Sequence, residues 1–277
     1  MKLSMSTFLY YNYPLDEAIK RLAKLGYQGV EIWGGRPHAY CDDVSEQEAA
    51  ELRKLIDSNG MEISAFIPAQ FRYPTCLCSP NEKVRTDSVE YIKKSILASL
   101  RLGCDKVSLC PGHTLYGQGY GNGMKQLTSS LDELVEFASG KNVSLLLEPA
   151  HRYESDLIIT IEDGVRLIND QGYDNLGIVM DTGHCYVNKE PLGDCVSLLK
   201  DIPFHIHLDD NFGKSDDHLV PGEGSICFIP FLNALNESGY DGYLTFELGW
   251  GYTADPDAAA YQSKKALESI EREMHVA

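Results

Sequence analysis

The chain has 277 residues, 43% of them hydrophobic, and a formal net charge of −17 at neutral pH. Its length allows one large α/β domain or two ordinary ones, and its apolar content is enough for a substantial core. The negative charge argues against a nucleic-acid partner, because the 24 Lys and Arg residues form no long run that could bind phosphates. No apolar stretch approaches the ~20 residues that cross a bilayer, and the first residues lack a signal-peptide core, so we expect a cytoplasmic protein with no membrane partner.

Short apolar strands alternate with helical segments along the whole chain, which is the pattern of a parallel sheet with crossover helices. Strands are predicted at residues 3–9, 29–33, 62–67, 106–110, 144–148, 177–181, 204–208 and 243–248. Helices are predicted at residues 14–25, 45–58, 81–102, 124–139, 161–169, 191–199, 231–238 and 257–273.

No linker rich in Pro, Gly and Ser divides the chain, so we expect a single domain over residues 1–277. Eight strand–helix units close most simply as a (β/α)8 TIM barrel, whose active site lies at the C-terminal ends of the strands. An open doubly wound sheet is the alternative, but no Gly-x-Gly-x-x-Gly follows the first predicted strand.

The last four predicted strands each have an ionisable side chain at or near their C-terminal end. These residues are Glu148, Asp181, His207 and Glu247. Strand ends of a barrel meet at one rim, and carboxylate oxygens with an imidazole nitrogen suit manganese, magnesium, cobalt or zinc. Each residue could instead cap a helix or pair with Arg, but four on successive strand ends favour a metal, because buried charges are rare unless paired or bound to an ion. His205 points deeper into the barrel and is expected to be a hydrogen-bonded core residue.

Further polar side chains are expected on the same face. His184 follows Asp181 by three residues on what is expected to be a loop after the sixth strand, and His113 follows the fourth strand, so either could bind the substrate or another ion. A long polar loop follows the seventh strand, and its Asp216 and His218 could bind an additional metal, although a solvated charge cluster is the alternative.

The loop after the second strand brings Trp33, Arg36 and His38 to this face, a composition that could hold a polyhydroxylated sugar. Trp33 could equally plug the top of the barrel. Two glutamates beside one metal suggest an acid/base pair that moves a proton at carbon, with the metal polarising a ketose carbonyl and stabilising the enediolate. Proton removal on one face and return on the other gives epimerisation.

Three segments resemble a known superfamily: residues 29–39 (GVEIWGGRPHA), Leu147-Glu148-Pro149 and residues 218–224 (HLVPGEG). They are similar to the sugar phosphate isomerase/epimerase superfamily, the xylose-isomerase-like TIM barrels that include ketose 3-epimerases and endonuclease IV. The first segment is the most specific and is most similar to ketose 3-epimerases of the fructoselysine type. The resemblance spans all eight strand–helix units, whereas Pro-Gly-Glu-Gly alone marks only the superfamily.

The resemblance implies a 3-epimerase of a ketose or ketosamine such as fructoselysine, with a small sugar as substrate and one divalent ion per chain. Mn2+ is favoured, and Mg2+, Co2+ or Zn2+ are possible. The residues that match the metal ligands are Glu148, Asp181, His207 and Glu247. Glu148 and Glu247 also match the proton-transferring pair, and Glu154 and His184 match substrate-binding residues. We expect a homo-oligomer, a dimer or a tetramer.

Two observations leave alternatives open. Ketose 3-epimerases have an arginine where this chain has Gly213-Lys214, so contacts to the first carbons of the substrate are in doubt. Endonuclease IV is the rival within the superfamily, because eight residues match its three-zinc site: His113, Glu148, Asp181, His184, His207, Asp216, His218 and Glu247. However, the segment 67–70 lacks the matching histidine, and the net charge opposes DNA binding. Hydroxypyruvate isomerase and inosose dehydratase chemistry also remain open.

Overall fold

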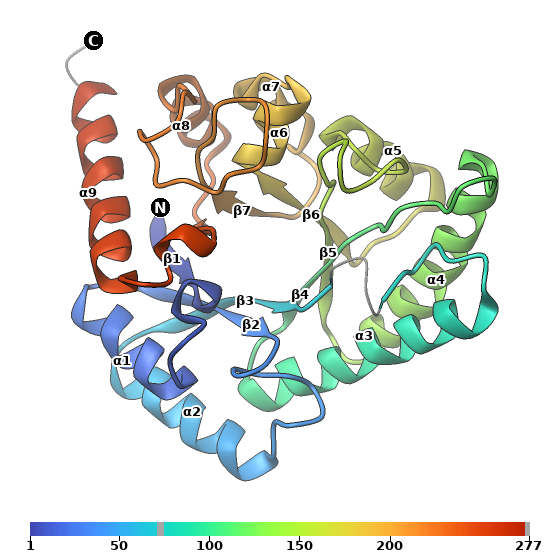
Figure 1. The fold of residues 1–277 in the computed structure, drawn as a ribbon, viewed down its shortest axis with the longest axis horizontal. Helices are drawn as coiled ribbons and strands as arrows, with labels where there is room; N and C mark the ends of the chain where they lie inside the picture. Colours follow the sequence, from blue (N-terminus) through green and yellow to red (C-terminus); the bar gives the residue numbers. More distant parts are fainter. Residues whose placement is uncertain (71–74, 275–277) are drawn as a thin grey trace.

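The computed structural model describes residues 1–70 and 75–274. Its parallel strands pair in chain order, and the barrel closes because β1 (Lys2–Ser6) pairs with both β2 (Gly29–Gly34) and β8 (Tyr243–Phe246). The strands between them are β3 (Glu62–Pro68), β4 (Lys106–Leu109), β5 (Ser144–Leu147), β6 (Leu176–Asp181) and β7 (Phe204–Leu208). Figure 1 shows the helices arranged around this closed sheet. The prediction of a (β/α)8 TIM barrel is confirmed.

The helices lie close to their predicted positions. They are α1 (Leu15–Lys24), α2 (Glu46–Ser58), α3 (Glu82–Leu102), α4 (Tyr120–Ser139), α5 (Ile161–Gln171), α6 (Thr182–Asn188), α7 (Leu192–Leu198), α8 (Ile229–Ser238) and α9 (Pro256–Met274), with 3-10 turns η1 (Thr7–Tyr10) and η2 (Trp250–Tyr252). Ser45 and Glu48 form a capping box at the start of α2, in which the Ser45 hydroxyl accepts the Glu48 N–H and the Glu48 side chain accepts the Ser45 N–H. None of the helices in the described part of the chain is long and apolar enough to span a membrane.

Two local expectations were wrong. The first strand ends at Ser6 and not at Leu9, because the chain turns into η1, where the Thr7 hydroxyl accepts the N–H of Trp33. The segment after β6 is not a loop. It forms the short helix α6, whose N-cap is Asp181, and the Asp181 carboxylate accepts the N–H of His184 at 2.7 Å.

The interior of the barrel is partly polar. Ser4, Ser64, His205 and Thr245 are all buried, and the hydroxyls of Ser4 and Ser64 are 2.8 Å apart. The apolar core lies mainly between the sheet and its helices, where side chains such as Ile32, Ile96 and Phe231 are fully buried. The hydrophobic layer therefore supports the barrel from outside and leaves the upper interior to ionisable groups.

Candidate metal centre and active site

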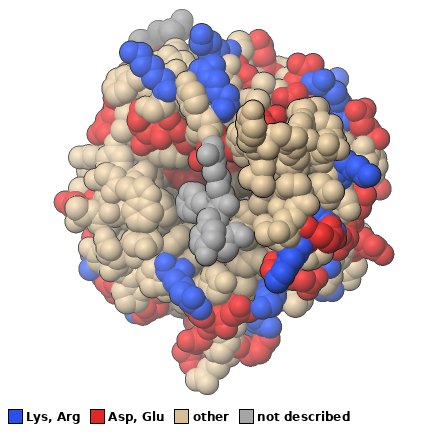
Figure 2. All heavy atoms as spheres, turned by 45° about the vertical axis from the view of Figure 1, so that its right-hand side comes forward, with Lys and Arg blue, Asp and Glu red and all other residues tan. Residues whose placement is uncertain are grey.

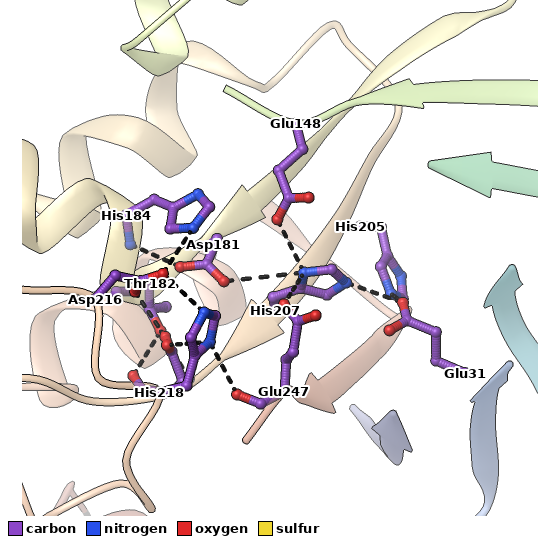
Figure 3. Close-up of polar contacts among 12 residues, drawn as sticks. Glu31, Glu148, Asp181, Thr182, His184, His205, His207, Asp216, His218 and Glu247 are labelled. Carbon is purple, nitrogen blue, oxygen red and sulfur yellow. Dashed lines mark hydrogen bonds and ion pairs between the residues drawn. The ribbon is translucent and has the colours of Figure 1, made fainter. Parts of the chain in front are cut away.

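The four ionisable strand-end residues converge, as Figure 3 shows. His207 lies on β7, Asp181 is the last residue of β6, and Glu148 and Glu247 directly follow β5 and β8. The Nδ1 atom of His207 is 3.1 Å from Glu148 Oε1, 2.9 Å from Glu247 Oε2 and 3.9 Å from Asp181 Oδ2. One ligand atom from each of the four residues lies within 4.8 Å of the others.

These four residues fit a divalent cation. Three carboxylates and one imidazole nitrogen are the donor set of manganese, magnesium, cobalt and zinc sites. Asp181 Oδ2 is buried and has no hydrogen-bond partner among the described residues, which is costly unless a cation satisfies it. The cluster could therefore bind a metal.

The surrounding protein groups shift the pKa values of Glu148 and Glu247 in opposite directions. Burial raises the pKa of Glu148. Burial also opposes ionisation of Glu247, but the charge and the hydrogen bond of His207, together with the charge of His218, lower the pKa of Glu247. Burial disfavours charge on His207 as well, yet the charges of Glu31, Glu247 and Glu148 raise its pKa well above the ordinary range. Two adjacent carboxyls with divergent pKa values are the arrangement that acid/base chemistry requires.

The opposite edge of the His207 ring faces Glu31, which the sequence analysis did not single out. Glu31 lies in β2 and is fully buried, and its Oε2 atom is 2.9 Å from His207 Nε2 and 3.1 Å from His205 Nε2. Burial opposes ionisation of Glu31, but the charge of His207 lowers its pKa. His205 is thus hydrogen-bonded in the barrel interior, as expected for a core residue. A charged residue inside an otherwise apolar strand was the available signal for Glu31.

A second group of ionisable residues adjoins the first. Asp216 Oδ2 is 2.7 Å from His218 Nε2, 3.2 Å from His184 Nε2 and 3.5 Å from His151 Nε2. His218 Nδ1 faces Asp209 Oδ2 at 2.9 Å. His184, Asp216 and His218 could together bind an ion, and Asp216 Oδ1 is buried without a hydrogen bond from the described residues. The sequence analysis identified three of these residues and missed His151 and Asp209.

The carboxylates and histidines of this second group shift one another's pKa values. Burial opposes ionisation of Asp216, but the charges of His218 and His184 lower its pKa. Burial also opposes charge on His184 and His218, and neighbouring carboxylates raise both pKa values well above the ordinary range. Burial and the charge of Asp181 raise the pKa of Asp209 to about 7. Asp216 Oδ2 therefore lies between the imidazole rings of His184 and His218, whose charged forms its own charge favours.

Asp210 fixes the loop between β7 and α8 that carries Asp216 and His218. Its Oδ1 accepts the N–H groups of Asn211 and Ile226, at 2.8 and 3.0 Å, and its Oδ2 accepts those of Gly222 and Gly224, at 2.8 and 3.0 Å. A Cβ atom on Gly224 would lie 2.3 Å from Asp210 Oδ1, so this close approach requires glycine. The Pro-Gly-Glu-Gly element is thus wrapped around one buried carboxylate.

Trp33 belongs to an aromatic cluster on η1, β2 and η2. Its ring packs edge-on against Phe8, with centroids 5.2 Å apart, and is tilted against Tyr11 at 5.4 Å. Trp250 contacts the same two rings, at 4.7 and 4.6 Å. Trp33 is buried, whereas Trp250 is about half exposed. Trp33 and the exposed Trp250 therefore share Phe8 and Tyr11 as packing partners, and contact of Trp33 with a substrate remains a prediction.

Arg36 and His38 have other partners in the structure. The Arg36 guanidinium pairs with both oxygens of Asp43 and lies over the ring of Tyr40, 4.4 Å from its centroid. His38 Nε2 lies 3.1 and 3.0 Å from the carbonyl oxygens of Tyr10 and Tyr13. Burial lowers the pKa of His38, and its ring ties the loop after β2 to the segment between β1 and α1. If Arg36 or His38 contacts the substrate, it must do so while it keeps its interactions with Asp43 or with the Tyr10 and Tyr13 carbonyl oxygens.

His113 and Glu154 lie on neighbouring loops and are each partly exposed. His113 Nδ1 is 2.8 Å from the carbonyl oxygen of Thr114 and 3.6 Å from Asp156 Oδ1. Glu154 Oε1 is 3.8 Å from His151 Nε2, which places Glu154 at the edge of the second group. Neither belongs to the four-residue cluster, so both remain candidates for substrate contact rather than for the first ion.

The surface around one recess has a simple charge pattern. Figure 2 shows Asp and Glu atoms set back in a recess, surrounded mostly by residues without charge, with Lys and Arg nearer the periphery. Such a surface favours cations and neutral polar molecules over polyanions.

Comparisons with known proteins agree with this geometry. The model of the xylose isomerase-like TIM barrel family matches residues 19–272. Fructoselysine 3-epimerase of Shigella flexneri is 29% identical, over 98% of each chain, and 3-dehydro-D-guloside 4-epimerase of Escherichia coli is 28% identical, over 96% of this chain and 98% of the relative. A solved D-tagatose 3-epimerase-like protein superposes with a TM-score of 0.85 at 28% identity, over the full length of both chains.

These relatives are named as epimerases, that is, as carbohydrate isomerases, so the predicted enzyme class is confirmed. The predicted resemblance to xylose-isomerase-like barrels and ketose 3-epimerases is confirmed as well. With the barrel, the polar strand ends and the family model in agreement over most of its length, the chain belongs to the xylose isomerase-like TIM barrel family.

Proposed function

We propose that this protein is a divalent-metal-dependent epimerase that acts at C3 of a ketose or ketosamine. The observation that carries the proposal is that Glu148 and Glu247 both face His207 Nδ1, at 3.1 and 2.9 Å, within one four-residue cluster that could hold an ion (Figure 3). The names of the relatives support a sugar as substrate.

Glu148, Asp181, His207 and Glu247 would hold the ion. When bound, the ion acts as a Lewis acid toward the ketose carbonyl and the adjacent hydroxyl, for which Mn2+ is favoured and Mg2+, Co2+ or Zn2+ would also serve. One glutamate takes the proton from C3, and the electron pair of the C–H bond forms the C2–C3 double bond of an enediolate. The other glutamate then donates a proton to the opposite face of C3, which inverts that centre.

The incorporation of deuterium into the sugar tests this proposal. Purified, manganese-loaded protein is incubated in deuterated water with fructoselysine and, separately, with fructose, psicose and tagatose, and the products are followed by NMR. Deuterium at C3 together with the growing epimer is expected. Exchange at C1 with an aldose product would contradict action at C3 and make the enzyme an aldose–ketose isomerase. Exchange at C4 would match the chemistry in the name of the 4-epimerase relative, and no exchange at all would contradict the proposal.

We also propose that Asp216, His184 and His218 bind an additional cation. Their mutual distances and the buried, unpartnered Asp216 Oδ1 support this role. Elemental analysis after dialysis against Mn2+ or Zn2+ should then give two ions per chain, and one ion in Asp216→Asn. One ion in both proteins would restrict these residues to contact with the substrate, the role predicted for His184 together with Glu154, His113, Trp33, Arg36 and His38.

Three expectations about the whole molecule remain predictions. They are a single domain over residues 1–277, a homodimer or homotetramer, and a cytoplasmic location. Light scattering coupled to size-exclusion chromatography tests the second, and one cooperative unfolding transition in the presence of Mn2+ would support the first.

A further inference from the structure

Glu31 has no role in the proposed proton transfer, yet it is buried at the centre of the barrel. Its exposed fraction is zero, and it stands in a strand whose other residues include Val30, Ile32 and Trp33. An unpaired carboxylate in such a position would strongly destabilise the fold, because burying a charge without a partner costs more free energy than burying a neutral polar group. Its two partners, His205 and His207, therefore have to explain its presence.

The contacts of Glu31 determine which nitrogen of His207 carries a proton. A neutral imidazole has one N–H and one lone pair, and only the nitrogen with the lone pair can bind a metal. In the structure carboxylates face both nitrogens of His207, so the ring can donate from either one until an ion takes Nδ1. Glu31 Oε2 is 2.9 Å from His207 Nε2, and a carboxylate accepts but does not donate, so Nε2 is the nitrogen that keeps its hydrogen when Nδ1 binds the ion. The lone pair is left on Nδ1, the atom that faces Glu148 and Glu247 at 3.1 and 2.9 Å.

His205 holds Glu31 in this orientation. Its Nε2 atom lies 3.1 Å from the same Oε2 oxygen that accepts from His207, and both histidine rings come from β7. Figure 3 shows Glu31 and His205 on the side of His207 away from Asp181 and Glu148. The carboxylate of β2 is thereby tied to two rings of β7 across the barrel.

We propose that Glu31 is a positioning residue that fixes the tautomer and the ring orientation of His207 for metal binding. This inference rests on the proposed metal site. Carboxylates behind a metal-bound histidine typically contribute a factor of about 10 to 100 in metal affinity, because they raise the basicity of the ligand and hold its ring.

The first experiment measures the Mn2+ dissociation constant by electron paramagnetic resonance of the free ion and by calorimetry. Glu31→Ala is expected to weaken binding about 10- to 100-fold. Glu31→Gln keeps an oxygen that can accept the Nε2 hydrogen but loses the charge, so its loss should be smaller than that of Glu31→Ala. Ser64→Ala is the matched control, since it removes a buried hydrogen bond of the barrel interior without touching either histidine, and it should keep the wild-type constant.

The second experiment observes the tautomer directly. In protein labelled with nitrogen-15 histidine and loaded with diamagnetic Zn2+, long-range proton–nitrogen spectra should show the His207 hydrogen on Nε2 and slow exchange of that hydrogen with solvent. In Glu31→Ala this signal should be lost or should exchange at least tenfold faster, whereas in Ser64→Ala it should persist.

The outcomes separate this inference from the proposed function. Wild-type protein that binds no divalent ion would overturn the metal site itself, and with it the inference. Tight wild-type binding with unchanged constants and an unchanged His207 signal in both Glu31 variants would overturn the inference alone. Loss of a whole ion per chain in Glu31→Ala, with the remaining affinity unchanged, would make Glu31 a ligand together with His205 and His207, and would also overturn it.

Discussion

Replacement of Asp210 by Asn tests whether one carboxylate organises the loop that carries Asp216 and His218. Asp210 is fully buried and accepts four backbone N–H groups, two on each oxygen. Asparagine has a single carbonyl oxygen, so it can keep two of these hydrogen bonds. Its amide group must then face the other two N–H donors, and donors cannot pair with donors.

The expected cost follows from the hydrogen bonds lost. Two bonds to a charged acceptor at ~1.5 kcal/mol each amount to about 3 kcal/mol. The amide should turn toward Gly222 and Gly224, because their N–H groups lie nearer to solvent than those of Asn211 and Ile226 and can be hydrated. A loss of about 3 kcal/mol in local stability corresponds to roughly a 150-fold larger population of the open loop, and to a matching increase in its hydrogen exchange.

Hydrogen–deuterium exchange measured by mass spectrometry on peptides covering residues 219–226 gives this quantity, and urea unfolding gives the global change. Asp217→Asn is the control, because Asp217 lies in the same loop and its Oδ1 accepts only the Ser215 hydroxyl among the hydrogen bonds described. Exchange in Asp210→Asn within threefold of the wild type would refute the assignment of these four bonds as the constraint on the loop. Mn2+ binding at the strand-end cluster should change little, since its ligands lie on or directly after strands.

Three other outcomes are expected. Glu148→Gln and Glu247→Gln should each slow deuterium incorporation at C3 by at least about 100-fold with an unchanged circular dichroism spectrum, and a near-normal rate in either would exclude it from proton transfer. Mn2+ at a hundred times the dissociation constant of the strand-end cluster should stabilise the wild type by about 2.7 kcal/mol through that site, and His207→Ala should abolish this contribution to the shift in thermal unfolding. Burial raises the pKa of Glu190 from 4.5 to about 7, so the folded state binds the proton more tightly and stability falls as pH rises through that window. Glu190→Gln should remove about 1.5 kcal/mol of this fall, after discounting for solvent screening, and an unchanged difference between pH 5 and pH 8 would contradict the cause given.

The sequence predicted those parts of the site that depend on periodicity. Glu148, Asp181, His207 and Glu247 each stand at or near the end of an apolar run, and parallel strands bring such ends to one rim whatever the loops do. The meeting of these four residues therefore needed no knowledge of side-chain packing.

Residues inside strands and short helices were harder to predict. Glu31 has apolar neighbours on both sides, and nothing local to it indicates that two histidines some 170 residues later lie within hydrogen-bonding distance. Helix α6 was missed because it has only seven residues and begins directly at the end of a strand. Its signal is the spacing of Asp181 and His184, which suits a side chain that caps a helix as well as one that binds an ion.

The roles of loop residues are limited in a different way as targets of prediction from sequence. Arg36 and His38 lie after β2, as predicted, but composition cannot reveal that Asp43 and two backbone carbonyl groups engage them. A polar side chain on a loop at the mouth of a barrel can either hold the loop or bind a ligand. Only its contacts distinguish these two uses.

The pairing of β1 with β8 has a consequence for synthesis of the chain. Lys2 is in register with Tyr243, so the first strand stays an open edge until β8 has been made. Glu247 directly follows β8 and is the last of the four cluster residues to be translated. Closure of the sheet and completion of the proposed ion site therefore both wait for the same segment. A chain that ends before β8 lacks both and leaves β1 and β7 each with an unpaired edge, so a cation bound at that site would stabilise only chains that contain β8.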